Sequence, residues 1–239
     1  MKKISLVALA CTAAVSVMAQ DGSTGTDANK DYKPLRTPMA SKVRFGITAG
    51  INSSKFYYSG SGTSGLNTTM KVGPFGGAYV NLPLGSVLAI QPGVTYNIYG
   101  SKGSLTSSAT VGGVTTSSTT NFQEDLHYIS VPVAVQIKPG NTGFFIEAGP
   151  QANFLVAAKF KNQTPGSNSG DRDNKDDYDN FDFSAFGGLG YITRIGLGFE
   201  AKYNAGFNNV LNDTQAGADN KWKNRAWTFG LFYNFGAAK

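Results

Sequence analysis

The sequence predicts an all-β fold: an eight-stranded antiparallel up-and-down β-barrel with short turns at one end and long loops at the other. Three observations lead to this prediction. Large apolar and small polar residues alternate with period two in eight segments, the connections between segments are alternately long and short, and Tyr and Trp gather near segment ends. A sheet with lipid on one face and a narrow lumen on the other accounts for all three, so the barrel is expected to be transmembrane, with periplasmic turns and extracellular loops.

The clearest element is a hairpin over residues 126–156. Its first half alternates aliphatic residues with small or polar ones, and Lys138-Pro139-Gly140-Asn141 then forms a turn. The return run alternates in the same way, with Phe144 and Ile146 on one face and Glu147 and Gly149 on the other. Strict alternation over this length predicts two antiparallel strands.

The other six strands are expected at residues 42–52, 71–82, 88–98, 181–192, 195–205 and 226–235. The range 71–82 is the least regular, because Phe75 and Tyr79 are out of phase with Val80 and Leu82. Residues 100–121 consist almost wholly of Ser, Thr and Gly, which predicts a loop. Residues 159–180 and 208–223 are expected to be long loops as well.

The N-terminus predicts export. Residues 1–19 have the basic start, apolar stretch and small-residue cleavage site of a signal peptide, and residues 20–41 are expected to form a disordered periplasmic lead-in to a barrel domain at 42–239. Cys11, the only cysteine, lies in the leader, which excludes disulfides and cysteine-based metal sites from the mature chain. Loss of two leader lysines lowers the formal charge from +6 to about +4, and the scattered basic residues predict no nucleic-acid partner.

Five charged residues fall on the expected inner face of the strands. A charge in a narrow barrel is costly unless it is paired, so a lumen charge network is the hypothesis for these positions. No spacing among them supports a pair of catalytic carboxylates. The network comprises Arg44, Glu147, Asp182, Glu200 and Lys202.

Two further features are candidate sites. His127 is the only histidine and has no partner pattern for a catalytic triad or a metal, so it is expected at the barrel rim. Residues 171–179 are dense in Asp and could bind Ca²⁺, but Arg172 and Lys175 interrupt them and the EF-hand glycine and distal Glu are absent, which favours a solvated acidic loop. No catalytic, cofactor or metal site is therefore predicted.

Several short motifs resemble the porin-family outer-membrane β-barrel domain common in Bacteroidetes, whose members include PorT-like barrels associated with type IX secretion. The resemblance implies an outer-membrane barrel over residues 42–239 and no single activity. Ser130 and Lys202 stand where the family often has an acidic residue and an arginine, so a shared interior charge pair does not carry over. The matching motifs are Gly46-Ile47-Thr48-Ala49-Gly50-Ile51-Asn52, His127-Tyr128-Ile129-Ser130-Val131-Pro132, Phe145-Ile146-Glu147-Ala148-Gly149-Pro150, Lys202-Tyr203-Asn204-Ala205-Gly206 and Phe229-Gly230-Leu231-Phe232-Tyr233-Asn234-Phe235.

Three functions of different classes follow. The first is a closed, non-enzymatic anchor or component of a cell-surface or secretion assembly, with outer-membrane lipid around the barrel and protein partners at the extracellular loops. The second is a small passive pore through the lumen. The third, an enzyme, would need a catalytic constellation that the sequence lacks. A soluble secreted β-barrel that binds a ligand is disfavoured, because it would bury the bulky face in a continuous core.

Overall fold

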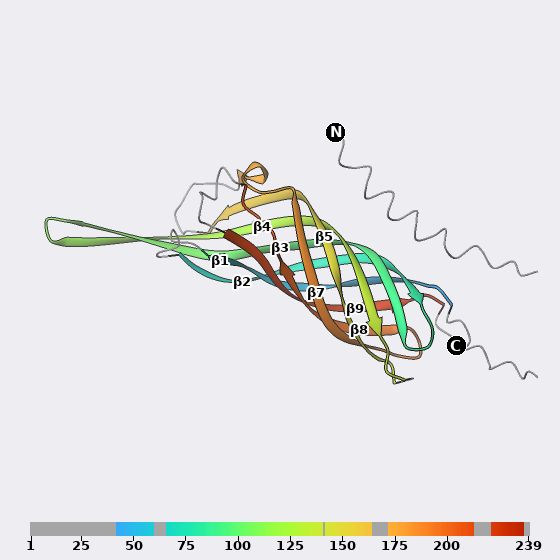
Figure 1. Ribbon diagram of the computed structural model, residues 1–239. Helices are drawn as coiled ribbons and strands as arrows, with labels where there is room; N and C mark the ends of the chain where they lie inside the picture. The colour runs from blue at the N-terminus through green and yellow to red at the C-terminus, as the bar shows by residue number, and fades with distance from the viewer. Residues whose placement is uncertain (1–41, 60–65, 141, 164–171, 213–220, 237–239) are drawn as a thin grey trace, which may run out of the picture. The chain divides into compact units, whose positions relative to one another are not determined.

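A computed structural model describes residues 42–59, 66–140, 142–163, 172–212 and 221–236 (Figure 1). The predicted leader and lead-in, residues 1–41, lie outside the described residues. None of the helical structure in the described ranges is long and apolar enough to cross a membrane. The elements are β1 (Arg44–Ser59), β2 (Leu66–Pro83), β3 (Leu88–Val111), β4 (Val114–Ile137), β5 (Phe144–Asn162), β6 (Arg172–Asp173), the 3₁₀ helix η1 (Lys175–Asp177), β7 (Phe181–Ile192), β8 (Leu197–Gly206) and β9 (Lys221–Asn234).

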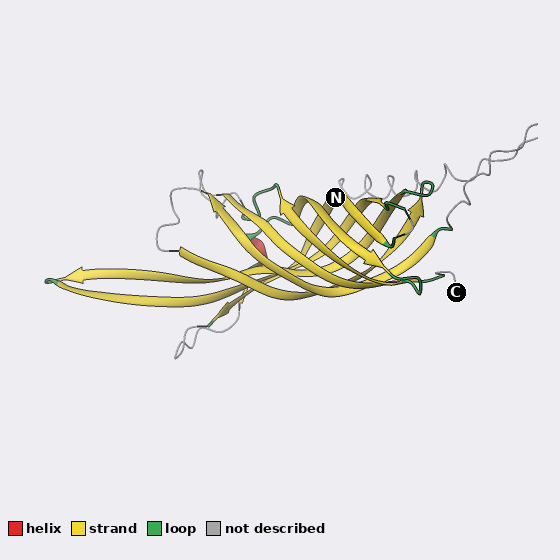
Figure 2. Ribbon diagram, turned by 90° about the horizontal axis from the view of Figure 1, so that it is seen from below, coloured by secondary structure: helices red, strands yellow, loops and turns green. Residues whose placement is uncertain are grey.

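Eight of these strands close into a ring in which every pair of neighbours is antiparallel (Figure 2). The order around the ring is β1, β2, β3, β4, β5, β7, β8 and β9, and β9 pairs back to β1. The two-residue β6 adds to the end of β5. The eight-stranded antiparallel barrel predicted from the sequence is confirmed. The end with the connections 84–87, 138–143 and 193–196 is called the turn side here, and the opposite end the loop side.

The two faces of the strands differ as the alternation predicts. In β9, Leu231 is 64% exposed and its neighbour Phe232 is 6% exposed. The expected phase difference in β2 is confirmed: Phe75 and Tyr79 point inward and are buried, whereas Val80 and Leu82 lie on the other face, and the register with β3 shifts between Met70 and Phe75. Exposed apolar side chains from all eight strands form an apolar band around the barrel, which includes Ile47, Ile51, Val72, Val94, Ile129, Val135, Ile146, Phe183, Leu189, Phe199, Trp227, Phe229 and Leu231.

The predicted loop at 100–121 is wrong, because these residues form the outer half of β3 and β4 (Figure 1). The two strands remain paired as far as Val111 and Val114, and the ribbon extends well past the barrel wall. Gly112 and Gly113 both have positive φ, +60° and +79°, as a two-residue type I′ turn requires. Threonine favours strands, and hydroxyl pairs such as Thr106–Thr119 (3.1 Å) link the two halves. The loop prediction for residues 100–121 failed because it rested on composition alone, and Ser and Thr are also compatible with strands.

The long connection predicted at 159–180 is partly ordered too. β5 continues to Asn162, and β6 and η1 occupy part of the remaining segment. β9 begins at Lys221, five residues before the expected start, and β8 begins at Leu197 rather than at 195. The extensions of β5 and β9 lengthen strands on the loop side, the later start of β8 shortens that strand on the turn side, and the order of the barrel is unchanged.

Candidate functional site

The lumen is where a barrel of this kind would hold a ligand, but in this protein side chains fill it. Aromatic residues pack at its turn-side end, polar residues occupy its middle, and aromatic and aliphatic residues pack at its loop-side end. Three cavities between them measure about 10, 20 and 10 Å³. A cavity of that size holds about one water molecule, so these three spaces suit isolated waters rather than a ligand.

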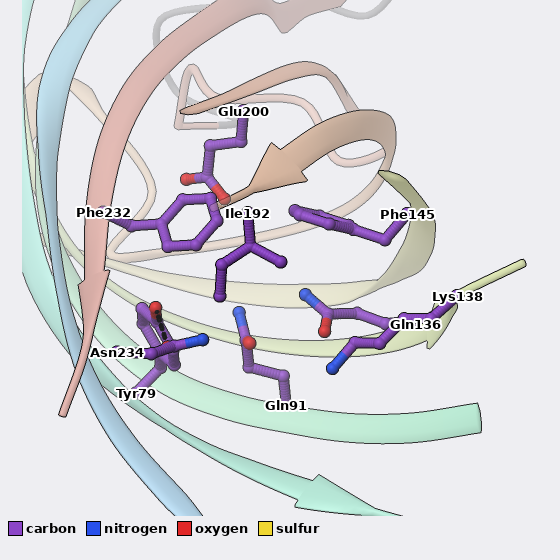
Figure 3. A pocket seen from close by; sticks show the side chains of 9 residues that line it. All are labelled: Tyr79, Gln91, Gln136, Lys138, Phe145, Ile192, Glu200, Phe232 and Asn234. Atoms are coloured by element: carbon purple, nitrogen blue, oxygen red, sulfur yellow. Dashed lines mark hydrogen bonds between the residues drawn. The ribbon is translucent and has the colours of Figure 1, made fainter. Parts of the chain in front are cut away.

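The turn-side plug consists of Tyr79, Phe145 and Phe232, which converge from β2, β5 and β9 (Figure 3). The Phe232 ring centroid lies 5.8 Å from that of Phe145 and 6.3 Å from that of Tyr79, both edge-to-face. The Tyr79 hydroxyl donates a hydrogen bond to Asn234 Oδ1 at 2.5 Å. The three rings thereby cover the lumen at its turn-side end.

Each ring of the plug lies across a glycine on the adjacent strand. Tyr79 is paired with Gly46, Phe145 with Gly190 and Phe232 with Gly198. A Cβ added to any of these glycines would come within 2.2–2.3 Å of the facing ring. Glycine is therefore required at these positions for the aromatic side chains to fold inward across the lumen.

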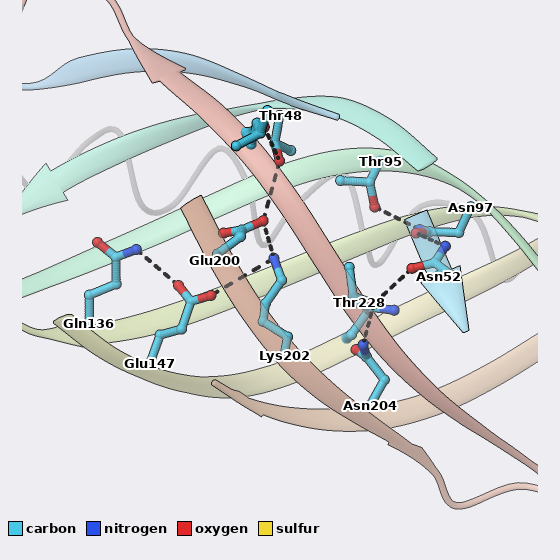
Figure 4. Close-up of polar contacts among 12 residues, drawn as sticks. Thr48, Asn52, Thr95, Asn97, Gln136, Glu147, Glu200, Lys202, Asn204 and Thr228 are labelled. Carbon is cyan, nitrogen blue, oxygen red and sulfur yellow. Dashed lines mark hydrogen bonds and ion pairs between the residues drawn. The ribbon is translucent and has the colours of Figure 1, made fainter. Parts of the chain in front are cut away.

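A charge cluster of Glu147, Glu200 and Lys202 lies next to the plug (Figure 4). Lys202 Nζ is 2.8 Å from Glu200 Oε1 and 3.8 Å from Glu147 Oε1. Thr48 donates to Glu200 at 3.2 Å, and Gln136 donates to Glu147 Oε2 at 2.9 Å. One partly buried cation thus pairs with two buried carboxylates, and neutral donors satisfy part of the remaining carboxylate oxygens.

Neutral side chains in the middle of the lumen form a chain of hydrogen bonds, which we call the amide belt. Figure 4 shows its part from Asn204 to Asn97. The belt begins where Asn204 donates to Thr228, continues through Asn52 to Asn97, and reaches Ser130. From there Ser130 donates to Asn153 at 2.7 Å, and Asn153 donates to Ser184 at 2.9 Å. The belt links β8, β9, β1, β3, β4, β5 and β7. It ties the wall together across the lumen without burying a charge.

The loop-side end is closed by the mouth cluster. Tyr178 and Leu211, from the connections after β6 and after β8, form an isolated bridge and pack onto the barrel residues Tyr99, Leu126 and Tyr128. Tyr178 is only 4% exposed, and Leu126 and Tyr128 are fully buried. The cluster comprises Phe56, Tyr99, Leu126, Tyr128, Leu155, Ala158, Tyr178, Val210, Leu211 and Ala226, with Tyr58 and Trp222 packed against it.

The five residues of the hypothesised lumen charge network do not all meet. Glu147, Glu200 and Lys202 are brought together in the charge cluster. Asp182 lies apart, near the mouth cluster, where its Oδ2 accepts a hydrogen bond from Asn224 at 2.9 Å. Arg44 is half-buried at the turn side and forms no ion pair with any described residue.

The two other candidate features lie on the loop side. His127 is half-buried, and its Nδ1 is 2.6 Å from the Tyr96 hydroxyl. Of the predicted acidic segment, Asp171 lies outside the described residues. In the remainder, Asp173 accepts a hydrogen bond from the Lys175 backbone N–H, and the Arg172 guanidinium stacks over Phe160 at 5.4 Å. Among the described residues no group of three or more acidic, His or Cys side chains is placed to hold a metal ion.

Glu124 connects the acidic segment to the barrel, beyond the apolar band. Its carboxylate accepts hydrogen bonds from Asn174 Nδ2, at 3.1 Å, and from the Tyr178 hydroxyl. Burial nevertheless raises the pKa of the Glu124 carboxyl above its ordinary value of 4.5. A raised pKa in the docked state means that docking is most stable below the ordinary value and weakens as the pH rises through the raised one.

We therefore expect residues 172–179 to dock less firmly as the pH is raised above the ordinary carboxyl pKa of 4.5. The measurement is the hydrogen-exchange protection factor of the Tyr178 amide, which donates to the Lys175 carbonyl, corrected for the intrinsic pH dependence of exchange. Glu124→Gln keeps an acceptor for Tyr178 and removes the titration, so its profile should be flat. An equally steep profile in this variant would contradict the assignment to Glu124.

Titration of the neighbouring Asp125 does not contribute to the pH dependence of this protection factor. Burial alone would raise its pKa, but ion pairs with Lys71 (2.9 Å) and Lys161 (3.2 Å) hold the pKa of Asp125 below its ordinary 3.8. Its contribution to stability is present above that ordinary value and is lost only as the pH falls through the lowered one. Both ion pairs therefore persist throughout the proposed pH range.

Comparison with solved structures finds similar barrels at low sequence identity. Neisserial surface protein A is 11% identical, with a TM-score of 0.44, and the match covers 82% of this chain and 100% of that one. Ail, the attachment invasion locus protein of Yersinia pestis, is 14% identical with a TM-score of 0.43 and the same coverage. OprG from Pseudomonas aeruginosa is 12% identical with a TM-score of 0.40, over 80% of this chain and 95% of that one. No curated protein matches the sequence significantly.

The sequence itself matches one protein family. The family described as "Outer membrane protein beta-barrel domain" aligns with residues 18–212, which is most of the chain and includes β1 to β8. This match agrees with the closed ring of eight antiparallel strands and its exposed apolar band. The chain therefore belongs to the outer membrane protein β-barrel domain family.

Proposed function

We propose that this protein is a closed, non-enzymatic anchor in the outer membrane that presents the outer part of its β3–β4 hairpin to protein partners of a cell-surface or secretion assembly. The observation that carries the proposal is the contrast between a filled lumen and a long ordered hairpin that projects from the barrel (Figure 1). The alternative, a small passive pore, has less support, because aromatic side chains pack across both ends of the lumen.

The hairpin has the features of a contact surface. β2 pairs with β3 only as far as Leu105, and β5 pairs with β4 only as far as Phe122. Within the described residues, 106–119 therefore pair only with each other and leave two free strand edges, over roughly 20 Å from Leu105 to Val111. Free edges with unpaired N–H and C=O groups are templates for the addition of a partner strand.

The exposed side chains of the hairpin do not block such a partner. Hydroxyl pairs Ser108–Ser117 and Thr110–Thr115, both at 2.9 Å, stiffen the ribbon. Residues 106–119 contain no charge and no proline, the residue types with which proteins usually protect an exposed edge. This supports recognition of an extended protein segment through the backbone.

The proposal also includes export through a signal peptide and a secretion assembly as the setting. Residues 1–19, outside the described residues, would be removed as a signal peptide near Ala19, and residues 20–41 would remain in the periplasm. The PorT-like motifs of the sequence favour a secretion assembly as the setting.

Shortening the hairpin should abolish the partner contact and leave the barrel intact. Deletion of 106–109 together with 116–119 removes four facing pairs and preserves the alternation and the Gly112-Gly113 turn. On intact cells, a photo-crosslinker at position 111 should capture a discrete protein partner in the full-length chain and none in the shortened one. The heat-dependent shift in gel mobility should be the same for both, since no barrel contact is lost.

A length-matched control separates backbone recognition from side-chain recognition. Ser108→Val with Ser117→Val keeps both strand edges and removes the hydroxyl pair, so it should preserve the adduct if the partner binds the backbone. The proposal fails if the full-length hairpin gives no adduct, or if the adduct survives the deletion.

A further inference from the structure

The outer face of the barrel carries a basic pocket where β1 meets β9, at the loop-side edge of the apolar band. Lys55 of β1 and Arg225 of β9 lie directly opposite each other in the antiparallel register. The pocket has a volume of about 330 Å³. Its remaining walls are Ser53, Tyr57, Met70, Tyr203 and Trp227.

The two cations of this pocket are not neutralised within the described residues. Neither Lys55 nor Arg225 has a carboxylate there within 4.0 Å, and Asp182, which interacts electrostatically with Arg225, lies beyond that distance. Like charges directly opposite each other destabilise a strand pair. Arg225 Nη1 donates to the carbonyls of Gly206 (2.6 Å) and Asn224 (3.1 Å), which orients the guanidinium. An anion held between the two side chains would remove this repulsion.

The level of the pocket along the barrel, relative to the apolar band, indicates where that anion would come from. On the same outer face, the next pair toward the turn side is Ser53–Trp227, and the one after it is Ile51–Phe229 in the apolar band. Trp227 is 45% exposed, and its ring centroid lies 4.9 Å from that of Tyr203. Such amphipathic rings prefer the level of the lipid headgroups, so the cations lie at headgroup level with an apolar wall beneath them.

We propose that this pocket binds a phosphorylated headgroup of a lipid in the leaflet on the loop side. Lys55 and Arg225 hold the phosphate, which suits an ammonium and an oriented guanidinium, while Trp227 and Tyr203 contact the first carbons of an acyl chain. The inference rests on the proposed membrane anchoring of the barrel and adds a specific lipid contact to it.

The test uses the two tryptophans of the chain, Trp222 and Trp227. With Trp222→Phe, the remaining fluorescence reports on the pocket. Purified protein in neutral detergent micelles is titrated with phosphatidic acid that carries brominated acyl chains, which quench tryptophan on contact. Brominated diacylglycerol is the matched probe without phosphate, and inorganic phosphate is added as a competitor.

Phosphatidic acid should quench Trp227 at a lower mole fraction than diacylglycerol does. Lys55→Gln and Arg225→Gln should each raise the half-quenching fraction of phosphatidic acid roughly fivefold, the usual contribution of one basic residue near a membrane surface. Lys159→Gln removes an exposed lysine from β5, which stands opposite β1 in the ring, and should have no effect. Because Lys55 makes no hydrogen bond with a described residue, Lys55→Gln tests the site even if Arg225→Gln fails to fold.

Each other outcome overturns the proposal. Equal quenching by both lipids, or no change in Lys55→Gln, would leave only a non-specific acyl contact. Full displacement by millimolar inorganic phosphate would assign the pocket to the free anion instead of a lipid. If even diacylglycerol leaves Trp227 unquenched, the lipid-facing assignment of this surface fails, and with it the membrane anchor on which the inference rests.

Discussion

Lys202→Met is expected to lower the free energy of unfolding of the barrel by roughly 3–5 kcal/mol. Lys202 is the only cation within 4.0 Å of Glu147 and Glu200 among the described residues, and both carboxylates are almost completely buried. Removal of one partner of a buried ion pair leaves an uncompensated charge, and here two carboxylates of like charge would face each other. Equilibrium unfolding in urea, from detergent or lipid vesicles, measures the loss.

Two further variants identify the cause of that loss. Adding Glu147→Gln and Glu200→Gln to Lys202→Met removes the stranded charges, so most of the stability should return, although the packing of the long side chain is still missing. Lys161→Met breaks an ion pair with Asp125 in which the lysine is 37% exposed, and should cost less than about 1 kcal/mol. A loss in Lys202→Met as small as in Lys161→Met would show that the charge cluster does not stabilise the barrel.

The sequence is sufficient for the barrel because one physical pattern determines it. Lipid on one face and a narrow lumen on the other impose an alternation that survives in every strand. β7 begins and ends at the predicted residues, and β9 alternates exposed and buried side chains as a period-two strand requires. The strand ends on the loop side were less predictable, since beyond the membrane no apolar face is needed and both faces of a ribbon such as 101–110 can be polar.

The interior was predictable in outline only. The sequence places Glu147, Glu200 and Lys202 on inner faces, but their distances depend on the stagger between strands, which alternation does not reveal. Two signals in the sequence indicate how the interior is filled. Asparagines recur on inner faces, which anticipates the amide belt, and glycines recur on the same faces, which leaves room for inward aromatic rings. Pairing Gly198 with Phe232 requires the register, and so the plug could not be found from one strand at a time.

Refolded wild-type protein is expected to give no discrete current steps in a planar bilayer, and opening the lumen should require both ends. The turn-side plug and the mouth cluster block the lumen in series. Tyr79→Ala, Phe145→Ala and Phe232→Ala together should therefore remain silent, as should Tyr99→Ala with Tyr128→Ala. The combination of all five should give reproducible steps, because only the polar side chains of the charge cluster and the amide belt then remain in the lumen, and water that enters from both ends can hydrate them.

Thiol labelling tests the same series arrangement without relying on conductance. In a Cys11→Ser background, Ser130→Cys places a single thiol in the amide belt, between the two aromatic ends. A charged, membrane-impermeant thiol reagent should modify it at least tenfold faster when either end is truncated, since each truncation admits water from one side. Five large-to-small substitutions cost several kcal/mol each, so the heat-dependent gel shift must first show that each variant is folded. Discrete steps in the wild type, or rapid labelling with both ends intact, would mean that the aromatic ends do not seal the barrel. The proposal of a closed anchor would then be replaced by that of a passive pore.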